Sequence, residues 1–113
     1  MMFKKSGQQT EVRENMRGGD GSIELTALCT ELPAHMRLMS TIRVAPGCSI
    51  GEHTHENETE LYYFISGHAT LIDDGVRTEA DPGDVMSTAS GHSHGVINET
   101  DEDIIILACI ITD

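Results

Sequence analysis

The stretch that decides the fold reads Gly47-Cys48-Ser49-Ile50-Gly51-Glu52-His53-Thr54-His55-Glu56-Asn57-Glu58-Thr59-Glu60. Its centre is a His-x-His pair. In an extended strand alternate side chains share a face, so His53 and His55 project to the same side with Cα atoms about 6.5 to 7 Å apart. Two imidazoles at that separation can close around one metal ion. The stretch therefore predicts a β-strand that carries part of a metal site.

Two further residues extend this candidate site. Glu60 stands where the next strand should start, and neighbouring strands lie only about 4.8 Å apart, so its carboxylate can join the two imidazoles. A fourth ligand must come from elsewhere, and the candidate is His94. Three neutral imidazoles with one carboxylate suit Mn, Fe, Co, Ni or Zn. An isolated His-x-His is by default a solvent-facing pair without a role, but its register with Glu60 and His94 favours a metal.

From Ser22 onward the chain alternates short β-type runs with turns every 8 to 12 residues or so, a spacing typical of a sandwich or barrel. The expected strands are residues 23–29, 37–44, 61–65, 69–72, 76–79, 85–88 and 95–98. Pro46-Gly47, Asp74-Gly75 and residues 81–84 have the chemistry of tight turns. The apolar run 104–111 fits a strand or a helix by periodicity, and its β-branched residues favour a central strand. The sequence therefore predicts an all-β fold.

Length and charge bound the domain organisation and the partners. A chain of 113 residues fits one domain. We expect residues 1–21 to form a loose N-terminal tail and first turn, and residues 22–113 to form the barrel domain. Seven Lys and Arg against 19 Asp and Glu give a formal charge of −12, which repels phosphate backbones and anionic lipid headgroups. We therefore expect no nucleic-acid partner and no membrane partner.

Cysteine usage bears on the compartment. The three cysteines stand at wide spacings that match neither a disulfide framework nor a Cys-x-x-Cys metal knuckle. No stretch approaches the roughly 20 apolar residues of a spanning helix, and no apolar run follows the first lysines. These features predict a cytoplasmic protein.

Two segments of the chain resemble a known family. Residues 47–67 read G-x5-H-x-H-x4-E-x6-G, and residues 83–98 read G-x5-A-x-G-x2-H-x3-N. Together they resemble the two sequence motifs of the cupin superfamily, in the same order and at the family's separation. One position departs, since Ala89 stands where the family usually has proline. The resemblance implies a single-domain double-stranded β-helix, or jelly-roll barrel, that forms a homodimer. It also implies one divalent metal ion per chain, held by His53, His55, Glu60 and His94.

Four other side chains near the motifs are weaker candidates for chemistry. His92 shares strand parity with His94, so it can carry a proton or replace a ligand, although a solvent-exposed loop histidine is the plainer interpretation. Tyr62 points inward if Glu60 does, and there it either offers a hydroxyl to a ligand or fills the core. Either of the loop carboxylates Glu56 and Glu58 can act as an acid or base, although a solvated acidic loop is the plainer interpretation.

Small cupins are often likened to oxalate decarboxylases, so an arginine that could bind a carboxylate substrate is a further candidate. The two-domain enzymes of that type carry a substrate-binding arginine three residues before the first motif histidine, and here that position is Ile50. The remaining candidates are Arg37 and Arg43, on the strand that leads into the first motif. Strand parity leaves open which of them, if either, points inward.

The leading functional hypothesis is a metal-dependent enzyme that acts on a small oxygenated molecule such as a carboxylate, a keto acid or a sugar derivative. Four protein ligands leave two positions of a six-coordinate ion for water, substrate or dioxygen, and open positions point to catalysis. Decarboxylation, dioxygenation and isomerisation all remain open, because cupins host many reactions. The alternative is a non-catalytic module that binds or senses a small ligand or the metal itself.

Overall fold

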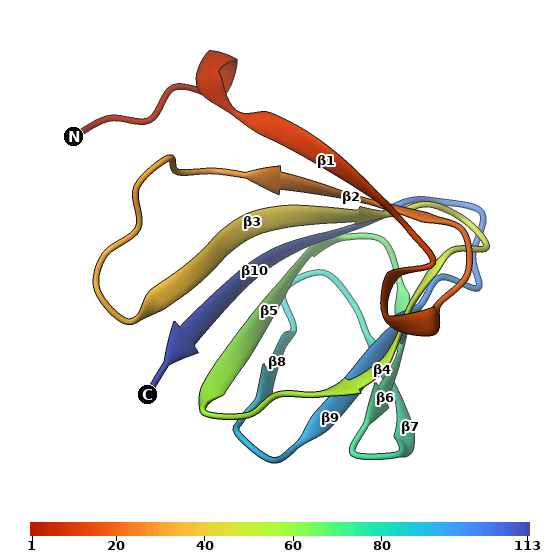
Figure 1. The fold of residues 1–113 in the computed structure, drawn as a ribbon. Helices are drawn as coiled ribbons and strands as arrows, with labels where there is room; N and C mark the ends of the chain where they lie inside the picture. Colours follow the sequence, from red (N-terminus) through yellow and green to blue (C-terminus); the bar gives the residue numbers. More distant parts are fainter.

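The computed structural model describes residues 1–113, which form two antiparallel sheets and two short 3₁₀ turns (Figure 1). The strands are β1 Gln9–Glu14, β2 Ser22–Ala27, β3 Met36–Val44, β4 Ser49–Thr54, β5 Glu58–Ser66, β6 Ala69–Asp73, β7 Val76–Ala80, β8 Val85–Thr88, β9 Ser93–Ile97 and β10 Ile104–Thr112. The 3₁₀ turns are η1 Lys5–Gly7 and η2 Met16–Gly18. No helix of the structure has the length and apolarity needed to cross a bilayer.

The two sheets form the jelly-roll barrel expected from the sequence. One sheet has the order β1-β2-β3-β10-β5-β8, and the other has the order β4-β9-β6-β7. Strands β4, β6, β7 and β9 of the smaller sheet lie at the lower right of Figure 1, away from β1 and β2 of the larger sheet. The apolar run 104–111 lies in β10, which pairs with β3 on one side and β5 on the other. The prediction of an all-β fold with a central C-terminal strand is confirmed.

Alternation along the strands places the core between the sheets. On β10 the side chains of Ile104, Ile106, Ala108 and Ile110 are buried, and the residues between them are more accessible. β5 alternates in the same way, with Tyr62 and Phe64 buried and Tyr63 exposed, as expected from strand parity. Without tryptophan, the interior is built mainly from aliphatic side chains around these two rings.

The N-terminal segment differs from the loose tail expected for residues 1–21. Residues 9–14 form β1, which pairs antiparallel with β2 from Gln9 opposite Ala27 to Glu14 opposite Ser22. All six β1 side chains are exposed. Backbone hydrogen bonds therefore hold this strand and apolar burial does not, so its sequence carries little of the hydrophobic alternation that marks the other strands.

Close backbone contact docks η2 onto β4. A Cβ atom on Gly51 would lie 2.0 Å from the carbonyl oxygen of Arg17, and one on Gly19 would lie 2.2 Å from the carbonyl oxygen of Ser49. The Asp20 amide also donates to the Ser49 hydroxyl at 2.8 Å. A side chain at either glycine would therefore prevent this contact. The contact holds the N-terminal segment against β4, the strand that carries His53.

Asn98, for which the sequence suggested no role, ties the end of β9 to the loop before β10. Its buried amide nitrogen donates to the carbonyl oxygens of Val44 and Glu102, at 2.9 and 2.7 Å. Its amide oxygen accepts from the backbone nitrogen and the hydroxyl of Thr100. Asn98 therefore has a structural role, away from the ligand cluster.

We predict that Gly51→Ala destabilises the protein by about 2 kcal/mol, because the new methyl group would overlap the Arg17 carbonyl and force η2 off β4. Urea unfolding measures the change. Gly7→Ala is the control, since a Cβ there meets nothing within 4 Å, and we expect it to stay within about 0.5 kcal/mol of the parent. Equal stabilities for the two variants would contradict the assigned contact.

Candidate metal centre

The four predicted ligands come together inside the barrel, from both sheets. His53 on β4 and His94 on β9 are direct cross-strand partners. His55 follows the last residue of β4, and Glu60 lies on β5 in the opposite sheet. The sequence suggested that Glu60 lies on the strand next to the histidines. The structure places it in the opposite sheet instead. The loop around Asn57, which has a positive φ of 61°, carries the chain from one sheet to the other, so the carboxylate reaches the histidines across the interior.

The ligand atoms of this cluster lie close together. The Nε2 atom of His94 lies 3.0 Å from Nε2 of His55 and 3.2 Å from Nε2 of His53. One oxygen of Glu60 lies 3.0 Å from His55 Nε2 and 3.1 Å from His94 Nε2. All four ligand atoms lie within 4.8 Å of one another. Ligands about 2.1 Å from an octahedral metal ion are separated by about 3.0 Å along each edge, so these separations fit a six-coordinate ion.

Hydrogen bonds at the outer ring nitrogens orient the three imidazoles. Nδ1 of His53 lies 2.8 Å from the Gly51 carbonyl oxygen, which can only accept. Nδ1 of His94 lies 2.8 Å from the Thr88 hydroxyl. A proton on Nδ1 leaves the lone pair on Nε2, the atom that faces the cluster centre. Burial also lowers the pKa of His53, which keeps that ring neutral at pH 7.

The electrostatics of the cluster call for a cation. His55, Glu60 and His94 are at least 95% buried, and three imidazole lone pairs with a carboxylate oxygen repel one another at 3 Å in a dry interior. His53, His55, His94 and Glu60 would each make an attractive contact with a divalent ion held among them. The donor set and its arrangement therefore fit a metal ion, and the cluster is a candidate metal site.

His55 is held by a carboxylate that is itself held by an arginine. Nδ1 of His55 lies 2.7 Å from one oxygen of Glu58, and Arg37 donates to both Glu58 oxygens at 2.8 Å. The Arg37 guanidinium, helped by the bond to His55 and opposed by burial, lowers the pKa of Glu58 to about 2. Glu58 is thus ionised at neutral pH and accepts the Nδ1 proton of His55, a contact that raises the basicity of a metal-binding imidazole. Glu58 therefore has a defined partner and is not a solvated loop residue.

Tyr62 and Thr88 complete the environment of His94. The Tyr62 ring stacks on the His94 ring with centroids 4.8 Å apart and an angle of 18° between the planes. Complete burial, followed by the adjacent Glu60 carboxylate, raises the pKa of Tyr62 well above its ordinary value, so its phenol stays protonated. Thr88 lies directly opposite Glu60 in the β5–β8 pair and bonds to His94. Nothing in the sequence singled out Thr88, because its role depends on which strands face each other.

Two other sequence candidates point away from the cluster. His92 is exposed, and its Nδ1 lies 2.5 Å from a carboxylate oxygen of Asp74 on the β6–β7 turn. Arg43 is also exposed and forms ion pairs with Glu24 and Asp103. Of the two arginines that the sequence proposed, only Arg37 lies near the ligands.

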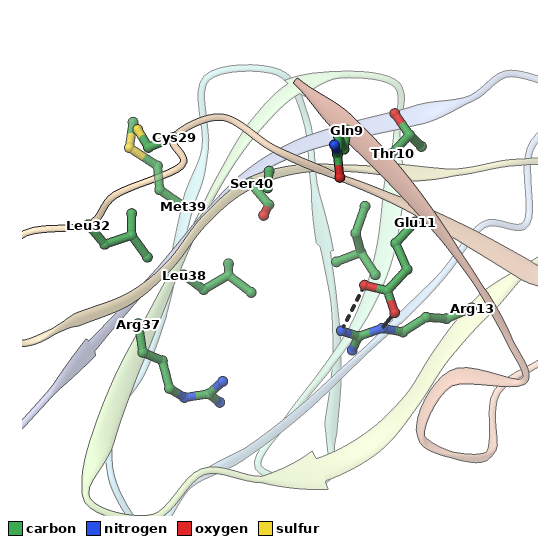
Figure 2. A pocket seen from close by; sticks show the side chains of 12 residues that line it. Gln9, Thr10, Glu11, Arg13, Cys29, Leu32, Arg37, Leu38, Met39 and Ser40 are labelled. Carbon is green, nitrogen blue, oxygen red and sulfur yellow. Dashed lines mark hydrogen bonds and ion pairs between the residues drawn. The ribbon is translucent and has the colours of Figure 1, made fainter. Parts of the chain in front are cut away.

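A pocket of about 350 Å³ lies between β1, β2 and β3, on the side of the barrel where Arg37 contacts Glu58 (Figure 2). Buried Leu25 and Ser40 lie at its inner side, and the paired Glu11 and Arg13 lie at its outer edge. Arg37 contributes to its wall and also contacts Glu58. The pocket therefore borders the residues that support His55 and does not include the four ligands themselves.

Comparison with protein families identifies one match. A family model described as "Cupin domain" matches residues 40–110. Among characterised sequences, an oxalate-binding protein from Thermotoga maritima is 37% identical over 113 residues, covering 98% of this chain and 93% of the relative.

Solved structures agree with this match. The crystal structure of a predicted oxalate decarboxylase from Thermotoga maritima has a TM-score of 0.93 at 36% identity and covers all of both chains. A Cupin 2 conserved barrel domain protein from Salinispora arenicola has a TM-score of 0.69 at 31% identity, covering 89% of this chain and 81% of that one. A sugar phosphate isomerase from Silicibacter pomeroyi, with a TM-score of 0.81 but 18% identity over all of this chain and 76% of that one, shares the fold.

We predict that Glu58→Ala weakens divalent-metal binding about 10- to 100-fold, because His55 loses the carboxylate that orients it. Competition with a chromophoric chelator measures the affinity. Glu56→Ala is the matched control, since it removes the same charge from an exposed side chain on the same loop. The assignment fails if the two variants bind metal equally well.

Proposed function

The chain belongs to the cupin domain family, and from that premise we propose that it binds a small carboxylate at a mononuclear divalent-metal centre, with oxalate as the first candidate. The convergence of His53, His55, His94 and Glu60 on one point carries this proposal. The oxalate-binding relative at 37% identity supports the choice of ligand. The donor set suits Mn, Fe, Co, Ni or Zn, with one ion per chain.

Each part of the site has a defined task in this proposal. A divalent ion held there supplies a Lewis acid that polarises a carboxylate or carbonyl oxygen. Burial of three of the four ligands excludes water from one side, and His53, which is only partly buried, marks the side open to a ligand. The protonated phenol of Tyr62 stands beside Glu60 as a potential hydrogen-bond donor. Glu58 neutralises Arg37, which makes that arginine a support for His55 and a poor anion receptor.

The leading reaction class is metal-dependent chemistry on the bound molecule, of the decarboxylase, dioxygenase or isomerase type. The structure related at 36% identity, which is named a predicted oxalate decarboxylase, supports the first of these. The second candidate is a non-catalytic module that binds or senses the ligand. The orientation of His92 toward Asp74 favours this candidate, because it removes one of the proposed proton carriers from the cluster.

Calorimetric titration of oxalate into the metal-loaded protein tests the proposed function. We expect saturable binding by the loaded protein and none by the metal-free protein. His53→Ala should lose the stoichiometric ion and with it oxalate binding. A variant that retains one ion per chain would refute the ligand assignment. Turnover of a panel of small acids by the loaded protein separates the two candidates, since tight binding without turnover identifies a module.

We also propose that the protein is a homodimer, joined through the outer face of the larger sheet. One cross-strand row on this face is uncharged, with Leu107 on β10 flanked by Thr41 and Tyr63, and with Val85 beyond Tyr63. Tyr63 and Val85 are 45% and 63% exposed. Two chains that each carry a charge of −12 repel one another, so this uncharged row is where a symmetric contact costs least.

We predict that the parent protein sediments as a dimer at micromolar concentration and that Tyr63→Lys sediments as a monomer, because the new charges would face each other across the contact. Val76→Lys is the matched control, since Val76 is 66% exposed on β7 in the other sheet. A monomeric parent, or a dimeric Tyr63→Lys variant, would refute this interface.

We further propose a cytoplasmic location. Its support is the set of three free thiols, Cys29, Cys48 and Cys109, all half-buried. Burial raises the pKa of Cys109, which keeps that thiol protonated and unreactive. Free thiols of this kind persist in a reducing compartment.

A further inference from the structure

Arg17, which the sequence analysis did not single out, is the one arginine in the structure without a carboxylate partner. Arg13, Arg37, Arg43 and Arg77 each form an ion pair with a glutamate or aspartate. Arg17 forms no ion pair and no side-chain hydrogen bond, and it is exposed on η2. In a chain with 19 acidic residues, a guanidinium left free of them is a distinct feature.

The backbone places Arg17 beside the candidate metal centre. Its carbonyl oxygen is the group against which Gly51 is packed. The carbonyl oxygen of Gly51 in turn accepts from Nδ1 of His53 at 2.8 Å. Gly51 therefore links Arg17 to His53, the candidate metal ligand that is only partly buried.

The backbone at Arg17 also fits a functional role. Arg17 has a φ of 55° and a ψ of 28°, a left-handed conformation that favours glycine or asparagine. Its neighbours Gly18 and Gly19 show that small residues occur in this loop. An arginine held in a strained conformation at the edge of a site is a candidate for ligand contact.

We propose that Arg17 binds the anionic end of the ligand that faces away from the metal cluster, and so selects small dianionic carboxylates over singly charged analogues. This inference rests on the proposed function, because it assumes that a carboxylate binds at the cluster. A guanidinium fork matches the two outer oxygens of a dicarboxylate. The free charge also provides locally the attraction for anions that the acidic surface of the chain does not.

Calorimetry of the metal-loaded protein with oxalate and with oxamate, in which an amide replaces one carboxylate, tests the role of Arg17. We expect the parent to prefer oxalate. Arg17→Gln should weaken oxalate binding about 10- to 100-fold, affect oxamate less, and leave the metal content unchanged. Arg17→Lys should fall between, because it keeps the charge and loses the fork. Arg77→Gln is the matched control for net charge, since Arg77 pairs with Glu99.

The possible failures are distinguishable. If Arg17→Gln binds oxalate as the parent does, loses both ligands equally, or loses the metal, the role assigned to Arg17 is wrong and the proposed function stands. The same holds if Arg77→Gln weakens oxalate binding to the same extent. If the metal-loaded parent binds neither anion, the proposed function fails and the role of Arg17 fails with it.

Discussion

The structure depends on one electrostatic constraint, the packing of three imidazole nitrogens and a carboxylate oxygen within 4.8 Å of one another inside the barrel. His94 Nε2 contacts the ligand atoms of His53, His55 and Glu60 at 3.0 to 3.2 Å. Without a cation these groups repel, and burial removes the water that would screen them. The folded barrel therefore favours an ion at this cluster, and we expect metal binding to add to the stability of the protein.

Hydrogen bonds between the two sheets maintain this cluster. Thr88, on the larger sheet, bonds to His94 on the smaller one. Arg37 on β3 and Glu58 at the start of β5 form a chain of contacts that ends on His55. Both contacts span the two layers of the barrel, so strand positions and ring orientations are fixed together. This coupling explains how an exposed arginine can influence a buried ligand without touching it.

Much of this could be predicted from local patterns. The spacing of residues 53, 55, 60 and 94 named the four members of the cluster, and most strands and turns lie within a few residues of where periodicity and turn chemistry placed them. β1 was missed because an exposed edge strand has no buried face and therefore no apolar alternation. Arg17 was missed because it lies far from both motifs in sequence, and only the docking of η2 on β4 brings it to the site.

The sequence by itself determined the ligand chemistry, because residue types and their spacing are local properties of the chain. It also determined the all-β character and the central position of β10, because apolar runs and turns report on burial. Only the tertiary structure decided that Glu60 reaches the histidines from the opposite sheet, that Arg37 serves His55 through Glu58, and that Arg17 stands free beside His53. Each of these depends on which strands face one another across the barrel, and long-range pairing leaves no trace in the spacing of nearby residues.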